Sequence, residues 1–262
     1  MVCDLDIELW KFRDIFFEEE THTYTDSLGT KYTSVTKFVH EFCEEQDWDK
    51  IAEKYAVKHN MAVADVKAMW DKNKNEAASM GTQVHSYMEN LWKRKHYQPV
   101  EPVGDYERVR KNGLEAYNHL CRRFVPIRNE FIVYKPEWAL CGTIDYLCWD
   151  RGEDCIAILD WKTNKEIKKE NPFQQCIGPL EGLPDCNYIH YSAQLSTYKL
   201  LIERMTNLRV GELALVHLKR DGWEYIPCRD FSVEIGAYLG NRKVETLEGL
   251  TRKIIDQKLG IV

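Results

Sequence analysis

The stretch that decides the fold runs from Gly142-Thr143-Ile144-Asp145 to Asp160-Trp161-Lys162, with fourteen residues between the two motifs. The second motif follows the apolar run Ile156 to Leu159, which is typical of a buried strand. Side chains alternate across a strand, so Asp160 and Lys162 share one face. A turn at residues 151–154 is expected to pair this strand with the one that carries Asp145. Two carboxylates and an amine then meet, a set suited to holding hard divalent cations and activating water against a phosphodiester.

Two further segments carry polar groups at helical spacing. Upstream, the chain reads Gly81-Thr82-Gln83-Val84-His85-Ser86-Tyr87-Met88-Glu89, which puts a histidine and an acid on one helical face. Downstream, it reads Gln194-Leu195-Ser196-Thr197-Tyr198, which pairs an amide with a phenol in the same way. Glu130 adds a carboxylate on the strand expected before Asp145.

In this order, the motifs resemble those of the PD-(D/E)XK nuclease superfamily, in its RecB-like exonuclease branch. Asp145, Asp160 and Lys162 resemble the pattern that names the superfamily, and the flanking segments resemble the GxxxHxxxE and QLxxY helices of the RecB-type branch. The resemblance spans about 120 residues. It implies an α/β, restriction-endonuclease-like fold with an αβββαβ core and a helical N-terminal elaboration.

The periodicity of the chain agrees with such a core. We expect a single nuclease domain over 1–262, divided into an N-terminal hairpin and helical elaboration (1–80), a catalytic core (81–228) and a C-terminal helix (229–262). The expected elements are a hairpin at 21–36, helices at 49–70, 81–95 and 105–124, strands at 131–134, 140–149 and 156–161, a long loop at 164–188, a helix at 189–204, strands at 212–219 and 223–227, and a final helix at 233–258.

The composition limits where the protein acts. The chain of 262 residues has no apolar run near the roughly 20 residues of a membrane-spanning helix, and its acidic N-terminus does not resemble a signal peptide. We therefore expect a soluble, intracellular (cytoplasmic) protein that does not use a membrane, a setting that includes a phage or viral protein acting in its host. The net charge of −6 argues against wholesale coating of nucleic acid, but a local basic groove such as Lys162-Thr163-Asn164-Lys165 would suffice.

Nine cysteines, an odd number without an export signal, favour reduced thiols. Some RecB-type relatives hold an iron–sulfur cluster with one cysteine before the nuclease core and three after it. Only Cys228 lies beyond Cys186 here, so we expect no such cluster. Cys141, Cys148 and Cys155 lie in strand-like sequence and are expected to be small core residues.

The resemblance also implies a metal site. Carboxylates of Asp145 and Asp160 and the backbone carbonyl of Trp161 would hold Mg²⁺ or Mn²⁺, with two ions expected and His85 completing one coordination sphere. Imidazole favours Mn²⁺ over Mg²⁺. Two acids stay open: Glu89 would bind a second cation or orient Lys162, and Glu130 would bind a cation or form a structural pair.

The remaining expected site residues act on the substrate. Lys162 would polarise the attacking water or neutralise the pentavalent phosphate, and burial beside cations would lower its pKa. Gln194 would bond the scissile phosphate or a catalytic carboxylate. Tyr198 would contact the DNA backbone or buttress Lys162. Thr163, Asn164 and Lys165 are expected to contact nucleic acid.

The activity implied is that of a metal-dependent deoxyribonuclease that digests single-stranded DNA or DNA ends, in repair, recombination or replication. The helical segment 49–97 would form a wall past which one strand is threaded. The chain has no GxxxxGK[ST] phosphate loop, so any helicase would be a separate partner. Two alternatives stay open: a structure-selective endonuclease, and a catalytically silent scaffold of the same fold that binds nucleic acid.

Overall fold

A computed structural model describes residues 2–18, 21 and 23–241 of the chain. In this part of the chain, a mixed sheet of eight strands has the order β1-β2-β3-β5-β6-β7-β8, and β4 pairs with β5. The strands are β1 (Phe16–Glu18), β2 (Thr23–Thr25), β3 (Lys31–Ser34), β4 (Phe124–Lys135), β5 (Leu140–Asp150), β6 (Cys155–Lys162), β7 (Val210–Lys219) and β8 (Gly222–Pro227).

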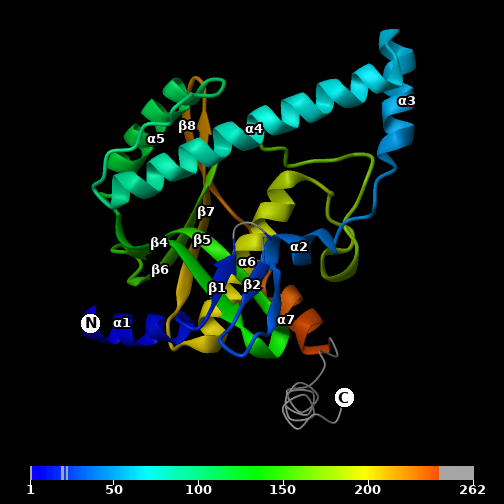
Figure 1. Ribbon diagram of the computed structural model, residues 1–262. Coiled ribbons are helices and arrows are strands. Elements are labelled where there is room, and N and C mark those ends of the chain that lie inside the picture. Colours follow the sequence, from blue (N-terminus) through cyan, green and yellow to red (C-terminus); the bar gives the residue numbers. More distant parts are fainter. Residues whose placement is uncertain (1, 19–20, 22, 242–262) are drawn as a thin grey trace.

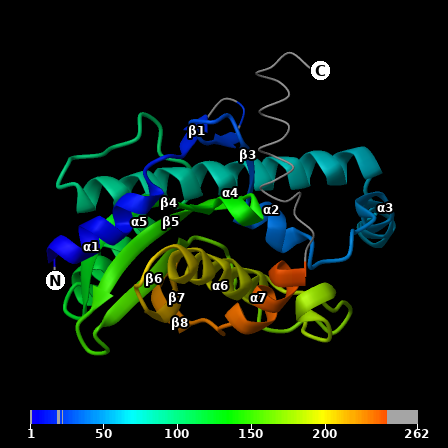
Figure 2. The same ribbon diagram turned by 90° about the horizontal axis from the view of Figure 1, so that it is seen from below.

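Helices cover both faces of this sheet (Figures 1 and 2). Helices α4 and α5 lie on one face, while α6 and α7 lie on the other. The helices are α1 (Val2–Leu9), α2 (Val35–His40), α3 (Trp48–His59), α4 (Val63–Trp92), α5 (Tyr106–Leu120), α6 (Asn187–Met205) and α7 (Ser232–Asn241), with 3₁₀ turns at Trp10–Phe12, Pro136–Trp138 and Gly178–Leu180.

The predicted three-strand meander is confirmed. Strands β4 and β5 pair antiparallel along almost their whole length. Strand β6 returns antiparallel to β5, with Asp150 opposite Cys155 across the expected turn. Strand β7 then runs parallel to β6, which requires a crossover, and α6 supplies it on the sheet face opposite α4. The αβββαβ order of the core is therefore present.

Apolar residues on the two faces of β6 enter different cores. Ile156 and Ile158 pack toward α6, in the larger core. Ala157, Leu159 and Trp161 pack toward α4 and α5, in the second core. Because the side chains alternate, the strand is apolar on both faces until it reaches Asp160 and Lys162. The site thus lies at the end of a strand that two cores hold in place.

The N-terminal third differs from the expectation in two ways. Strand β3 of the predicted hairpin joins the main sheet by pairing parallel with the start of β5, so this elaboration adds strands as well as helices. The predicted helix 49–70 is broken, because Asn60 adopts a left-handed conformation (φ 51°) that ends α3. Helix α4 then runs unbroken through Gly81 to Trp92, so the helix expected at 81–95 is its second half.

Helix α3 crosses the beginning of α4 at a steep inclination, and the two extend beyond the sheet (Figures 1 and 2). This projection has a small core of its own, made of Ala52, Ala56 and Val66. The rings of Tyr55 and Trp70 pack against this core, and their centroids lie 5.5 Å apart in an edge-to-face contact. The projection is therefore a separate packing unit attached to the domain through the second half of α4.

Other expectations have mixed outcomes. Helix α7 begins where the C-terminal helix was predicted, but residues 242–258 of that prediction lie outside the described residues. Cys141, Cys148 and Cys155 are buried free thiols, as predicted. Among the described residues, none of the helices combines the length and apolar composition of a membrane span.

Candidate active site

Strands β5 and β6 bring the two carboxylates and the lysine together. Tyr146 pairs with Leu159, so the preceding Asp145 stands opposite Asp160 in the antiparallel ladder. The Nζ atom of Lys162 lies 2.5 Å from Oδ2 of Asp160. Asp145 Oδ2 accepts a hydrogen bond of 3.0 Å from the backbone N–H of Trp161. The Gly142–Asp145 and Asp160–Lys162 motifs thus form one cluster.

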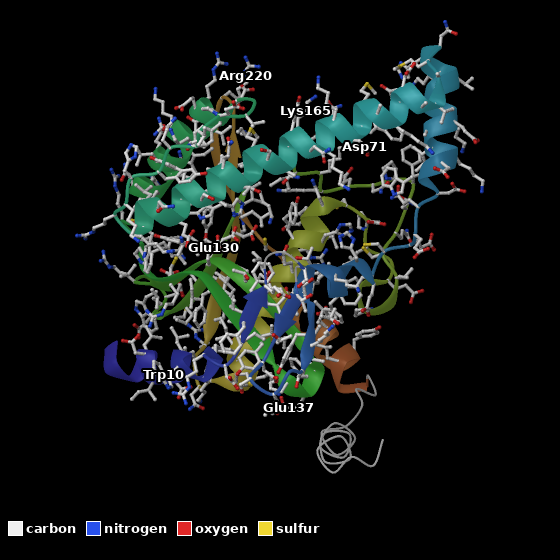
Figure 3. All side chains as sticks on the ribbon, viewed as in Figure 1. Trp10, Asp71, Glu130, Glu137, Lys165 and Arg220 are labelled. Atoms are coloured by element: carbon white, nitrogen blue, oxygen red, sulfur yellow. The ribbon has the colours of Figure 1, made fainter. Side chains whose placement is uncertain are left out.

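Two more acidic or basic groups reach this cluster from neighbouring elements. On α4, Nδ1 of His85 lies 3.4 Å from Asp145 Oδ2 and 4.0 Å from Glu130 Oε1. Glu130 lies on β4, below α4 in Figure 3. Its φ of 46° falls in the left-handed region, which non-glycine residues rarely adopt. Residues with such unusual backbone angles cluster at functional sites.

The donor set suits a divalent cation. Ligand atoms of His85, Glu130 and Asp145 all lie within 4.8 Å of one another. Burial, followed by the charges of Asp145, Glu89 and Asp160, raises the pKa of Glu130 to about 8. Burial and the charge of Asp145 likewise raise the pKa of Asp160 to about 6, although Lys162 opposes this shift. Carboxylates so close together repel one another, and a bound cation would relieve that repulsion.

Lys162 keeps its charge in this environment. Burial disfavours the ammonium group, but the charges of Asp160 and Asp145 outweigh burial and raise the pKa of Lys162 above its usual value. The sequence-based expectation of a lowered pKa concerned an amine beside bound cations, whereas the protein residues alone act in the opposite direction. The amine also lies 4.5 Å from the ring centroid of Tyr191 on α6. Sequence reasoning missed Tyr191, because no motif of the resemblance contains it.

The QLxxY residues lie on α6, near this cluster. Gln194 Nε2 donates a 3.0 Å hydrogen bond to the hydroxyl of Tyr198. Tyr198 is only 3% exposed, and a Cβ atom at Gly142 would lie 2.6 Å from its ring atom Cε1. Such close contact leaves no room for a side chain at position 142, which explains the glycine there. The burial of Tyr198 favours a buttressing role over contact with DNA.

The segment after Lys162 is fixed by three contacts. Thr163 Oγ1 approaches Gly81 on α4, where an added Cβ would meet it at 3.4 Å. The carbonyl oxygen of Asn164 accepts a 2.6 Å hydrogen bond from Nε2 of the buried His217. The Asn164 side chain accepts another, of 2.9 Å, from the hydroxyl of Tyr191. Lys165 follows as an exposed residue.

Glu89 lies at the edge of the cluster. It forms an ion pair with Lys93 one helical turn along α4. Its charge contributes to the raised pKa of Glu130, so the two carboxylates act on each other. Glu89 is not part of the group formed by His85, Glu130 and Asp145.

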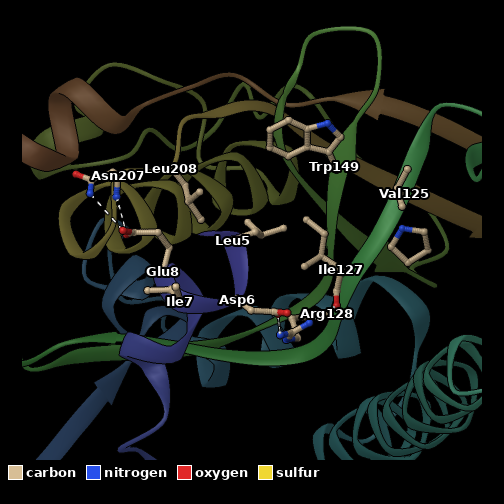
Figure 4. A pocket seen from close by; sticks show the side chains of 11 residues that line it. Leu5, Asp6, Ile7, Glu8, Val125, Ile127, Arg128, Trp149, Asn207 and Leu208 are labelled. Atoms are coloured by element: carbon tan, nitrogen blue, oxygen red, sulfur yellow. Dashed lines mark hydrogen bonds and ion pairs between the residues drawn. The ribbon is translucent and has the colours of Figure 1, made fainter. Parts of the chain in front are cut away.

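A cavity of about 660 Å³ lies elsewhere in the fold (Figure 4). It is lined by α1 and by β4 near Ile127, with Trp149 of β5. Asp6 pairs with Arg128 at its rim, and Glu8 accepts hydrogen bonds from Asn207. None of the expected site residues lines it.

Comparison with known families agrees with the resemblance. A family model of the PD-(D/E)XK nuclease superfamily matches residues 52–258, which is well over half of the chain, and the chain belongs to that superfamily. Membership suggests a nuclease that hydrolyses nucleic acid, and such nucleases typically use divalent metals. No curated protein matches the chain.

Proposed function

We propose that this chain is a metal-dependent DNA exonuclease of the RecB-like type, built as a single nuclease domain without an iron–sulfur cluster. One observation carries the proposal. Three strands and one helix bring His85, Glu130, Asp145, Asp160 and Lys162 into one cluster, which supports this proposal. Burying these carboxylates together raises the pKa of Glu130 and Asp160, which means that their ionised forms are disfavoured in the folded protein. Such an unfavourable arrangement is typical of a functional site rather than of a structural one.

His85, Asp145 and Glu130 are proposed to hold one Mg²⁺ or Mn²⁺ ion, together with Asp160 and the backbone carbonyl of Trp161. Glu89 would serve a second ion. A bound divalent cation supplies Lewis-acid polarisation of the phosphodiester and a more acidic water. Asp160 pairs with Lys162 in this structure, so binding of a cation by Asp160 would leave the amine free to turn toward the substrate.

The raised pKa of Lys162 supports one of its two proposed roles. An amine that holds its proton is a poor general base but a good partner for negative charge. Lys162 would therefore neutralise charge on the pentavalent phosphate. Tyr191 would continue to hold its side chain, while Gln194 and Tyr198 would support the strand beside it.

The proposed substrate is single-stranded DNA or a DNA end, in repair, recombination or replication, with any helicase as a separate partner. Thr163, Asn164 and Lys165 lie directly after the lysine and would contact the strand. Helix α4 carries His85 in its second half and continues into the α3–α4 projection, which supports the proposal of a wall along the site (Figure 1). A structure-selective endonuclease and a silent binding scaffold remain as alternatives, and the following experiment separates them.

Linear and closed circular single strands, labelled with the same dye, are incubated with Mn²⁺ or with a chelator. The exonuclease proposal expects degradation of the linear strand alone, only with metal. Asp145→Asn should abolish this activity and most Mn²⁺ binding in calorimetry, whereas the matched variant Asp221→Asn, in the exposed β7–β8 turn, should keep both. Rapid nicking of the circle would favour the endonuclease, and Mn²⁺ binding without any cleavage would favour the scaffold.

A further inference from the structure

A second group of metal-ligand side chains lies where the end of α2 meets the start of α6. Cys43 follows α2, Asp185 precedes α6, and His190 lies near the beginning of α6. Nε2 of His190 is 3.1 Å from Sγ of Cys43 and 2.7 Å from Oδ1 of Asp185. Ligand atoms of all three lie within 4.8 Å of one another. The thiol, imidazole and carboxylate therefore converge on one point, with contributions from three segments of the chain.

The geometry does not fit a nucleophilic cysteine. In a Cys–His–Asp triad the thiol and the carboxylate bind opposite nitrogens of the imidazole ring, so that the proton can pass through it. Here both groups face Nε2, the same nitrogen. Burial and the charge of Asp185 also raise the pKa of the Cys43 thiol to about 12, which disfavours a reactive thiolate.

A further observation indicates that a ligand is expected there. Asp185 is only 7% exposed, and its second carboxylate oxygen, Oδ2, is buried with no hydrogen-bond partner among the described residues. Buried carboxylate oxygens without partners are rare, because their desolvation is uncompensated. This oxygen belongs to the same carboxylate whose Oδ1 contacts His190, so the cluster contains an unused acceptor.

We propose that Cys43, Asp185 and His190 supply three ligands of a zinc site, separate from the acidic cluster, with water as the fourth ligand. A sulfur, a nitrogen and an oxygen donor together suit Zn²⁺ and disfavour Mg²⁺ and Mn²⁺, which prefer oxygen. Ligands of a tetrahedral zinc ion lie roughly 3.3–3.6 Å apart, given its usual bond lengths. The observed separations of 3.1 and 2.7 Å need only a small opening to reach this spacing.

The site lies where the long loop 163–186 is already attached to α2. Ile177 N donates to the carbonyl of Phe42 at 2.8 Å, and the amides of Gln46 and Gln174 bond at 2.7 Å. His190 directly precedes Tyr191, the residue whose ring lies beside Lys162. Zinc would therefore fix this loop and the start of α6 relative to α2.

Cobalt substitution gives a test that is specific to the proposed site. The full-length protein is stripped with a chelator, dialysed against Mg²⁺ and titrated with Co²⁺. A thiolate ligand produces a near-ultraviolet charge-transfer band, and the acidic cluster contains no sulfur, so cobalt bound there contributes none. We expect the band to saturate at one equivalent of Co²⁺ and to disappear when Zn²⁺ is added.

Variants identify the ligands. Cys43→Ser should abolish the band, and Cys43→Ser and His190→Asn should each weaken zinc binding by about tenfold or more. The matched control Cys121→Ser, at a partly exposed thiol on the α5 side of the fold, should leave both unchanged. A folded parent without the band, or a band that persists in Cys43→Ser, would overturn the proposal. The parent titration decides this even if a variant misfolds, and nuclease activity does not enter the result.

Discussion

The amine of Lys162, on β6, lies 4.5 Å from the ring centroid of Tyr191, on α6. The two residues are 29 positions apart in the sequence. The aromatic face stabilises the ammonium charge, and the carboxylate of Asp160 pairs with the same group. The lysine is thus positioned by a residue three places before Gln194, outside the motif that the resemblance supplies. The contact makes Tyr191 a positioning residue.

Tyr191→Leu is therefore expected to lower kcat by roughly tenfold, which corresponds to a cation–π contribution of about 1–2 kcal/mol. Tyr191→Phe retains the ring and loses only the hydrogen bond to Asn164, so it should keep most of the parental kcat. Initial rates at saturating substrate measure both. Equal losses in the two variants would assign the effect to the hydroxyl group instead.

Metal affinity should depend on pH. The raised pKa values of Glu130, about 8, and Asp160, about 6, mean that protons occupy carboxylates that a cation needs ionised. Affinity for Mn²⁺ should therefore be weak at pH 6 and rise until the pH passes the pKa of Glu130. Calorimetry in buffers of different ionisation enthalpy should detect proton release on binding near pH 7.

The variant Glu130→Gln provides the comparison for this dependence. It removes the group that titrates near pH 8, so the increase in affinity above pH 7 should flatten and proton release should fall. Ionisation of an ordinary ion-paired carboxylate stabilises the folded protein. Ionisation of Glu130 destabilises it, because the pKa of Glu130 is raised in the folded state. Without metal, the parent should thus lose stability relative to Glu130→Gln as the pH rises from 5 to 9. An unchanged pH profile in the variant would exclude Glu130 from the site.

The close approach of Gly142 to Tyr198 gives a prediction about stability. An alanine Cβ at position 142 would lie 2.6 Å from the ring atom Cε1, in a core that cannot expand freely. Gly142→Ala should lower the free energy of unfolding by about 1–3 kcal/mol, the usual effect of overpacking. Denaturant titration measures this.

A second substitution tests the cause. Removing the ring with Tyr198→Leu should make Gly142→Ala nearly neutral, because the two residues are in contact and their effects are not additive. Gly236→Ala serves as the matched control, since its added Cβ would meet Leu200 at an ordinary 3.5 Å. Additive losses in the double variant would place the strain elsewhere.

Periodicity and motif order predicted the existence and order of the core strands, although β4 begins at Phe124, in sequence expected to be helical, rather than at residue 131. Alternation in β6 predicted that Asp160 and Lys162 share a face, and the turn predicted that Asp145 stands beside them. Contacts that depend on tertiary packing left no local pattern. Tyr191, His217 and Gly142 act through neighbours that are distant in sequence, so only the assembled fold identifies them.

The pairing of strand β3 with β5 and the Cys43 cluster were missed for the same reason. Strand β3 pairs with β5 over two residues only, a contact without a recognisable sequence signal. Cys43 and His190 are 147 positions apart, and ligands separated so widely do not form a spacing motif. The break between α3 and α4 depends on the left-handed conformation of one residue, Asn60. An asparagine in the sequence does not by itself indicate that conformation, so the break was not predicted.

The α3–α4 projection should control the preference for DNA ends. Its core is small and separate from the two cores that hold the site, and the ring of Trp70 closes it against Tyr55 and Trp48. Trp70→Ala should therefore loosen the projection while Mn²⁺ binding stays at the parental value. Val57→Ala, at an 84% exposed position on α3, is the matched control.

If the projection forces a strand to be threaded from its terminus, loosening it lets a closed circle reach the site. The ratio of linear to circular cleavage should then fall by about tenfold in Trp70→Ala and remain parental in Val57→Ala, a change of about 1.4 kcal/mol in discrimination. Labelled linear and circular single strands of one sequence, mixed in the same reaction, report the ratio directly. Increased proteolysis within residues 48–70 would show that the projection has loosened. If the ratio then stays at the parental value, the wall does not select for ends.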